Sequence, residues 1–171
     1  MRCLASGIAA VALLAHAGVA PAEAQGVRFG AGAGPTFNLE DDAGTDFHVM
    51  GTLGFGGAAG RPLGFRVDGM WQFADGGSII NGTGNLVYTF SVSDETKFRP
   101  YLIGGVGAYY FDPDGGDSST EFGINAGAGF TAPVGSGTTK LFGEARFHNI
   151  FTEGESTNIL PLTLGVMFGG N

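Results

Sequence analysis

The stretch LGFRVDGMWQFA, residues 63–74, alternates large apolar side chains with small or polar ones. One parity carries Leu63, Phe65, Val67, Trp71 and Phe73, and the other carries Gly64, Arg66, Asp68, Met70 and Gln72. Successive side chains of a β-strand point to opposite faces, so the stretch predicts a strand with one apolar face. Its length is close to the roughly ten residues that a tilted strand needs to cross the hydrocarbon layer of a membrane.

Seven other segments have a similar length, and most show the same alternation. They span about residues 27–37, 46–56, 79–90, 100–111, 121–131, 139–150 and 159–168. Segment 100–111, PYLIGGVGAYYF, is apolar on both parities, so a strand is predicted there without a facing. The fold class expected from these segments is all-β: an eight-stranded antiparallel up-and-down transmembrane β-barrel.

The N-terminus has the pattern of a secretory signal peptide. Arg2 precedes an apolar stretch at residues 8–20, and Ala22-Glu23-Ala24 fits the small-x-small cleavage pattern. Cleavage after Ala24 would remove residues 1–24, with the only cysteine, and leave residues 25–171 as the barrel domain. The alternative is a retained anchor, but the apolar stretch is short for a spanning helix.

The low content of charged residues favours a membrane protein over a soluble one. Charged residues make up 14% of the chain, whereas soluble domains average about 25%. Past residue 24 there is no apolar run of the roughly 18 residues that a spanning helix needs. A closed β-barrel is the other structure that satisfies every backbone polar group inside lipid, so the composition favours it.

The polar parity carries few charges, and these balance. A lumen charge cluster is expected from Arg28, His48, Arg66, Asp68, Glu144 and Arg146. Charges inside a narrow barrel must be paired, because an unpaired buried ion costs several kcal/mol. Aromatic residues toward the strand ends predict two interfacial girdles, formed by Phe29, Phe37, Phe47, Phe55, Phe65, Trp71, Phe73, Tyr88, Phe90, Tyr109, Tyr110, Phe130 and Phe168.

The connectors alternate in charge along the chain. Those expected outside the cell, at 38–46, 74–78, 112–121 and 152–158, contain no Lys or Arg. Their acids are Glu40, Asp41, Asp42, Asp46, Asp75, Asp112, Asp114, Asp117, Glu121, Glu153 and Glu155. The connectors expected inside hold or border Arg61, Lys97, Arg99 and Lys140, against Asp94 and Glu95. An even strand count, which puts both termini on one side, produces such a segregation.

Four segments carry a resemblance to a known group: residues 100–111, INAGAGFTAPV at 124–134, LFGEARFHNIF at 141–151 and LPLTLGVMF at 160–168. Over residues 26–168 the chain resembles the eight-stranded OmpA/OmpX-type and opacity-protein barrels. The resemblance implies a location in the outer membrane of a Gram-negative bacterium. It also implies that the barrel insertion machinery recognises the last segment through Phe168, although three more residues follow that Phe here.

The candidate catalytic and metal-binding patterns are incomplete, so no enzyme and no cofactor are expected. The segment around His148 resembles a lipid A deacylase barrel, which needs a Ser two residues after the His, but position 150 is Ile150. The acidic run Asp112–Asp117 lacks the order of a calcium-binding EF-hand loop. The net charge of −8 disfavours a nucleic-acid partner.

The function expected from the sequence is a structural or surface-interaction role through the acidic extracellular loops. The expected partners are outer-membrane lipid and lipopolysaccharide, whose phosphates and the loop acids would share divalent cations. Two alternatives stay open: a narrow ion channel gated by the lumen charges, and a soluble secreted β-barrel that binds an apolar ligand. Against the channel, eight strands enclose an interior that side chains fill.

Overall fold

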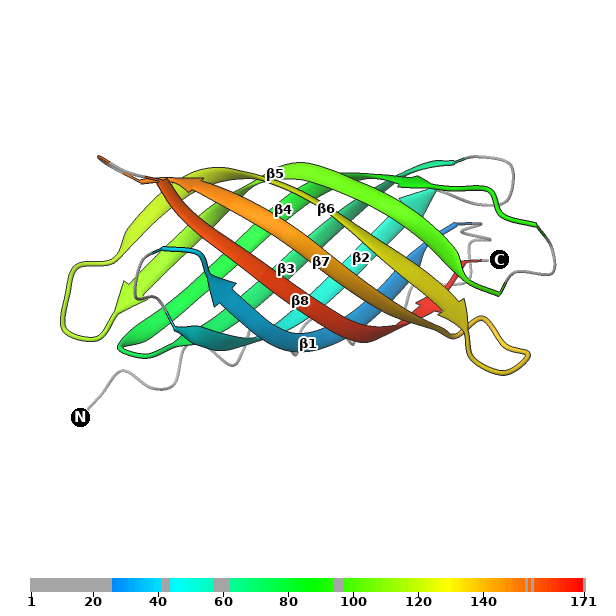
Figure 1. The fold of residues 1–171 in the computed structure, drawn as a ribbon, viewed down its shortest axis with the longest axis horizontal. Helices are drawn as coiled ribbons and strands as arrows, with labels where there is room; N and C mark the ends of the chain where they lie inside the picture. Colours follow the sequence, from blue (N-terminus) through cyan, green and yellow to red (C-terminus); the bar gives the residue numbers. More distant parts are fainter. Residues whose placement is uncertain are drawn as a thin grey trace, which may run out of the picture.

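The computed structural model describes residues 26–40, 44–56, 62–93, 97–152, 154 and 156–170. It is a closed barrel of eight strands (Figure 1). The strands are β1 (Arg28–Asn38), β2 (Thr45–Gly56), β3 (Leu63–Ala74), β4 (Gly77–Thr89), β5 (Arg99–Pro113), β6 (Ser119–Pro133), β7 (Lys140–Phe151) and β8 (Ser156–Gly169). The expected signal peptide, residues 1–24, lies outside the described residues.

Each strand pairs antiparallel with its neighbours in sequence, and β1 pairs with β8 to close the cylinder. The closing ladder runs from the pair Arg28 and Gly169 to the pair Asn38 and Ile159. The all-β, up-and-down antiparallel architecture expected from the sequence is confirmed. The described part of the chain contains no helix that is long and apolar enough to span a membrane.

The two ends of the barrel differ in their connections (Figure 1). The loop end carries the connections β1–β2, β3–β4, β5–β6 and β7–β8, and the terminus end carries the other three with the start of β1 and the end of β8. At the loop end, Asp75 and Gly76 alone join β3 to β4. Gly76 has a φ of 87°, a conformation that glycine adopts without the steric penalty of a Cβ atom.

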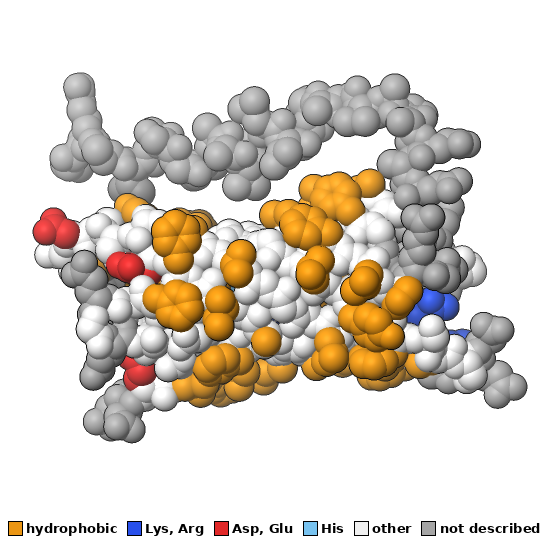
Figure 2. Space-filling view, turned by 90° about the horizontal axis from the view of Figure 1, so that it is seen from above, with side chains coloured by type: hydrophobic (Ala, Val, Ile, Leu, Met, Phe, Trp, Pro, Cys, Tyr) orange, Lys and Arg blue, Asp and Glu red, His pale blue; other side chains and the backbone are white. Residues whose placement is uncertain are grey.

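The outer wall is apolar and the lumen is mostly polar. On β3, Val67 and Trp71 are 43% and 47% exposed, whereas Arg66 and Asp68 are 4% and 2% exposed. Figure 2 shows apolar side chains along the body of the barrel, acidic groups at one end and Lys or Arg at the other. Residues 63–74 therefore turn their apolar parity to the outside and their polar parity to the lumen, as the sequence predicted.

Strand β5 acquires a facing that the sequence left open. Tyr101, Ile103 and Tyr109 are buried in the lumen, whereas Leu102 and Val106 are exposed on the outer wall. The expectation that Tyr109 belongs to an interfacial girdle is wrong, because its side chain is fully buried. Its hydroxyl lies 2.7 Å from Nδ1 of a lumen histidine, and that polar contact holds the ring inside.

The ladders extend further at the loop end than the alternation suggested. β5 continues to Pro113 and β6 starts at Ser119, so the connector expected at 112–121 is shorter. Cross-strand pairs such as Tyr109 with Glu121 continue into that segment. Asp112 and Glu121 consequently lie on strands. The acids Asp41, Asp42, Glu153, Glu155, Asp94 and Glu95 and the base Arg61 lie outside the described residues.

Candidate functional site

Four charged side chains form one network across the lumen, which we call the lumen network: Arg66, Asp68, Glu144 and Arg146. Nη2 of Arg66 lies 2.8 and 2.7 Å from the two carboxylate oxygens of Glu144. Asp68 contacts both guanidinium groups, at 2.9 Å from Nε of Arg66 and 2.9 Å from Nη1 of Arg146. Arg146 also pairs with Glu144. Two cations and two anions thus neutralise one another.

The strand pattern explains why these four residues meet. Arg66 and Asp68 are two residues apart on β3, as Glu144 and Arg146 are on β7, so each pair points inward. In the closed order β1 to β8, β3 and β7 stand on opposite sides of the barrel. The lumen network therefore ties two facing walls together and occupies the middle of the lumen.

Neighbouring polar side chains complete the lumen network. The Tyr101 hydroxyl donates to Glu144 at 2.7 Å, and Nδ2 of Asn85 donates to Asp68 at 2.9 Å. The guanidinium of Arg66 also lies 6.0 Å from the centre of the Tyr101 ring. The sequence did not identify Tyr101 as a member, because both parities of its strand are apolar. Its hydroxyl satisfies a buried carboxylate, which lowers the cost of burying that charge.

His48 and Arg28, expected in the same cluster, lie apart from the lumen network. The ring nitrogens of His48 lie 2.9 Å from the hydroxyl oxygens of Thr36 and Thr163, so His48 links β2 with β1 and β8. Arg28 stands at the terminus end, where its Nη2 donates to the carbonyl of Gly56 at 2.6 Å. Inward parity placed both side chains correctly, but their hydrogen-bond partners are not members of the lumen network.

His148 has no arrangement typical of a catalytic base with a nucleophile. Its Nδ1 lies 2.7 Å from the hydroxyl of Tyr109, and the two rings meet edge to face. Ile150, two residues further on, is fully buried and has no nucleophilic group. Among the residues that the structure describes, no group of three or more His, Cys, Asp or Glu side chains is placed to hold a metal ion.

The loop-end acids divide into two kinds. Asp46 points into the mouth of the lumen, where its Oδ2 accepts hydrogen bonds from Gln72 at 2.7 Å and Asn38 at 3.0 Å. It therefore closes the polar interior and is not a free loop acid as expected. Most of the other acids that the structure describes are open to solvent, and one mouth cavity is lined by Asp75, Asp112, Asp117 and Glu121. Glu40 and Asp114 are exposed at the same end.

A closed antiparallel cylinder with an apolar outer wall and a filled polar lumen has the fold of the eight-stranded outer-membrane β-barrels. No family model and no curated protein sequence matches the chain. Solved structures with the same fold do match, and they agree with the resemblance inferred from the sequence.

Three of these structures are informative. Neisserial surface protein A (NspA) has a TM-score of 0.68 at 18% identity, over 84% of this chain and 97% of NspA. A major outer membrane protein from Thermus thermophilus has a TM-score of 0.61 at 15% identity, over 84% and 99%. The outer membrane enzyme PagL has a TM-score of 0.52 at 16% identity, over 83% and 99%. The fold therefore occurs in an enzyme as well as in proteins described only by their location.

Proposed function

We propose that this chain is a small outer-membrane β-barrel without an open pore, which presents an acidic surface outside the cell. The observation that carries this proposal is the outer wall. Leu164, Phe122 and Leu86 are 71%, 69% and 65% exposed, and exposed apolar side chains occur on all eight strands. A soluble monomer rarely exposes a continuous apolar patch larger than a few hundred Å², so a surrounding lipid layer explains the wall.

Export and insertion form part of the proposal. Residues 1–24 would direct secretion and be removed. Phe168 lies on the outer wall, and its ring centre is 5.6 Å from that of Phe29 on the neighbouring strand β1. We propose that the insertion machinery recognises the last strand through Phe168 before β1 pairs with it.

The loop end would face outward and carry the interaction role. The described residues of this end include acids at the β1–β2, β3–β4 and β5–β6 connections and no Lys or Arg. Lipopolysaccharide is the proposed neighbour there, with divalent cations between its phosphates and the loop acids. If removal of calcium and magnesium left loop proteolysis and thermal stability unchanged, this part of the proposal would be abandoned.

A non-enzymatic role is also proposed, although PagL shares the fold. Its support is the environment of His148, whose hydrogen-bond partner is the phenol of Tyr109 and not a carboxylate. The lumen network joins β3 and β7 through ion pairs across the middle of the lumen.

The decisive experiment compares gel migration of boiled and unboiled protein, with and without detergent. We expect a detergent-dependent shift between the two forms, because the closed barrel stays compact unless it is heated. A monodisperse protein that is soluble without detergent would reject the membrane barrel and favour the soluble alternative with an apolar ligand.

Orientation is tested with single cysteines in intact cells. Asp114→Cys lies in the β5–β6 connection at the loop end, and Ser136→Cys lies in the β6–β7 connection at the terminus end. We expect a membrane-impermeant maleimide to label the first variant and not the second. The reverse pattern would contradict the outward loop end.

A further inference from the structure

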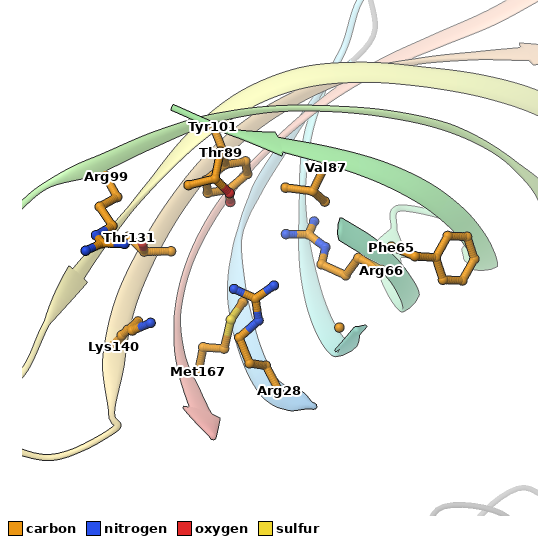
Figure 3. Close-up of a pocket in the computed structure, with 11 residues that line it drawn as sticks. Arg28, Phe65, Arg66, Val87, Thr89, Arg99, Tyr101, Thr131, Lys140 and Met167 are labelled. Atoms are coloured by element: carbon orange, nitrogen blue, oxygen red, sulfur yellow. The ribbon is translucent and has the colours of Figure 1, made fainter. Parts of the chain in front are cut away.

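The lumen opens at the terminus end into a cavity lined by four cationic side chains (Figure 3). Arg28, Arg66, Arg99 and Lys140 come from β1, β3, β5 and β7, respectively. These four strands alternate around the cylinder, so the cations approach the cavity from four sides. The cavity holds about 570 Å³ of empty space including its open mouth, and none of the described residues that line it is acidic.

Three of these cations lack a counter-charge within the described part of the chain. Arg66 is neutralised by Asp68 and Glu144. In contrast, none of Arg28, Arg99 and Lys140 forms an ion pair with a described residue. The charges of Arg28 and Arg99 both act on Lys140 through space. Like charges that face one cavity repel one another, and a bound anion would remove that repulsion.

The remaining lining supplies neutral donors and a partly apolar wall. Thr89 and Thr131 carry hydroxyl groups, and Tyr101 and Met167 contribute larger, partly apolar side chains to the wall (Figure 3). Thr131 is the cross-strand partner of Arg99, so a hydroxyl and a guanidinium share one wall. An anion in this cavity would therefore meet charged and neutral donors from several strands.

We propose that this cavity binds a phosphate group. A carboxylate offers two oxygens in one plane, whereas a phosphate has oxygens in three or more directions and up to two negative charges. Guanidinium groups bind such oxygens as two-pronged donors, and a lysine ammonium binds them as a point charge. Cations on separate walls fit the tetrahedral group better than the planar one.

Two sources supply this chemistry at the terminus end. One is a soluble phosphate or phosphate monoester that enters along the barrel axis. The other is the headgroup of an anionic phospholipid whose chains lie against the outer wall. The two sources share the phosphate group, and they are separated by presenting the phosphate with and without lipid.

The first arm of the test uses the full chain, purified from membranes of an expressing host in a maltoside detergent. Inorganic phosphate is titrated by calorimetry at constant ionic strength in chloride. We expect one saturable site, with binding weakened about tenfold or more by Arg99→Gln and by Lys140→Gln, because each removes a charge-assisted hydrogen bond. The second arm counts phosphatidylglycerol retained from mixed phosphatidylcholine micelles by native mass spectrometry.

Lys97→Gln is the matched control, because Lys97 is exposed at the same end, makes the same charge change and does not line the cavity. Heat-modifiable migration of each variant verifies that the barrel is folded. Saturable phosphate binding lost only in the cavity variants supports a soluble source, and selective loss of retained phosphatidylglycerol supports a lipid source. No binding in either arm, or equal loss in Lys97→Gln, overturns the proposal.

Discussion

Glu144 is the carboxylate that the lumen network depends on most, since it accepts hydrogen bonds from Arg66, Arg146 and Tyr101. Replacing Glu144 with Gln keeps the shape of the side chain but leaves the network with one net positive charge. Breaking one partner of a buried ion pair costs about 3–5 kcal/mol. We expect Glu144→Gln to lower the free energy of unfolding by about 3 kcal/mol, measured by denaturant titration in lipid vesicles.

Asp114→Asn is the control for this prediction, because it also removes one carboxylate charge but does so in an exposed turn. We expect a change within about 0.5 kcal/mol there. Equal effects of Glu144→Gln and Asp114→Asn would show that the lumen network contributes no more to stability than a surface charge does.

For single residues, the sequence predicted some of the side chains that point into the lumen and missed others. Parity alone placed Arg66, Asp68, Glu144 and Arg146 inside the barrel, because a strand sends alternate side chains to one face. It did not reveal that Asp46 turns inward to Gln72, because a residue at a strand end belongs to a loop or a ladder according to how far the pairing extends. Parity also does not predict which inward side chains contact each other, because contacts across the lumen depend on which strands face each other in the closed barrel.

Among the elements, β4 and β5 pack so closely that glycine is required on the lumen side. A Cβ atom on Gly105 would lie 2.1 Å from the carbonyl oxygen of Gly84 and 2.8 Å from Cα of Asn85. Both contacts involve backbone, so a side chain there must displace a strand. We expect Gly105→Ala to lower the free energy of unfolding by about 1–3 kcal/mol, measured by the same denaturant titration.

Gly82→Ala tests the same chemical change on the same ladder. Apart from Gly82 and its two chain neighbours, no residue has a heavy atom within 4 Å of the Cβ position of Gly82, so the added methyl group meets no clash. We expect Gly82→Ala to unfold at the same denaturant concentration as the unsubstituted protein. If Gly82→Ala were as damaging as Gly105→Ala, close strand packing would not be the cause.

The outward face of β3 makes a separate prediction about lipid contact. Val67 is exposed in the middle of this strand. An arginine near the bilayer midplane of a membrane barrel costs about 2–4 kcal/mol, and one near the interface costs about 0–1 kcal/mol. We expect Val67→Arg to lose stability in the first range and Ser119→Arg, at the loop-end start of β6, in the second. Equal small losses in vesicles would contradict a lipid-covered wall.

The bounds and facing of a strand were predictable where one of its faces is apolar and the other is polar. The bounds of β3 match residues 63–74, because apolar and polar parities contrast throughout. The facing of β5 was not predictable, because tyrosine counts as an apolar residue in the alternation pattern. In the structure Tyr101 and Tyr109 point into the lumen, where their hydroxyl groups form hydrogen bonds. At the loop end the paired strands extend beyond the residues that alternate in polarity, because hydrogen bonding between backbones does not require an alternating sequence.

For the molecule as a whole, the filled lumen predicts that ions do not pass. Arg66 and Glu144 bridge β3 and β7 directly, with side chains 5% and 1% exposed. We expect no steady conductance of the unsubstituted protein in planar bilayers. Discrete conductance steps would contradict this expectation and favour the alternative of a narrow channel.

A variant in which both partners are replaced by alanine, Arg66→Ala with Glu144→Ala, provides the comparison for this measurement. It removes the direct bridge without leaving one of its two charges unpaired. We expect conductance to appear in this variant, provided that heat-modifiable migration shows a folded barrel. A silent but folded variant would show that other lumen side chains block the path.

Strand count, closure and the charge difference between the two ends are properties of the whole chain, and the sequence predicted them together. The up-and-down connection of antiparallel strands sends alternate connectors to opposite ends, and the acids and bases of the sequence follow that alternation. The sequence does not predict the basic cavity, because the alternation pattern places Arg99 and Lys140 in or beside connectors and not on a lumen face. Their convergence with Arg28 follows from closure, which brings β1, β5 and β7 around one mouth.

The ladder between β1 and β8 has a consequence for chain connectivity. Because Arg28 stands beside Gly169, a short linker would join the two ends without moving a strand. The cylinder would then be a ring with no first or last element, and it could be reopened at another terminus-end connection. Such circular permutants would keep the same hydrogen bonds and lumen. They would differ in which strand is synthesised last. A permutant that is stable once folded but inserts poorly would show that insertion depends on the identity of the last strand, whereas the stability of the folded barrel does not.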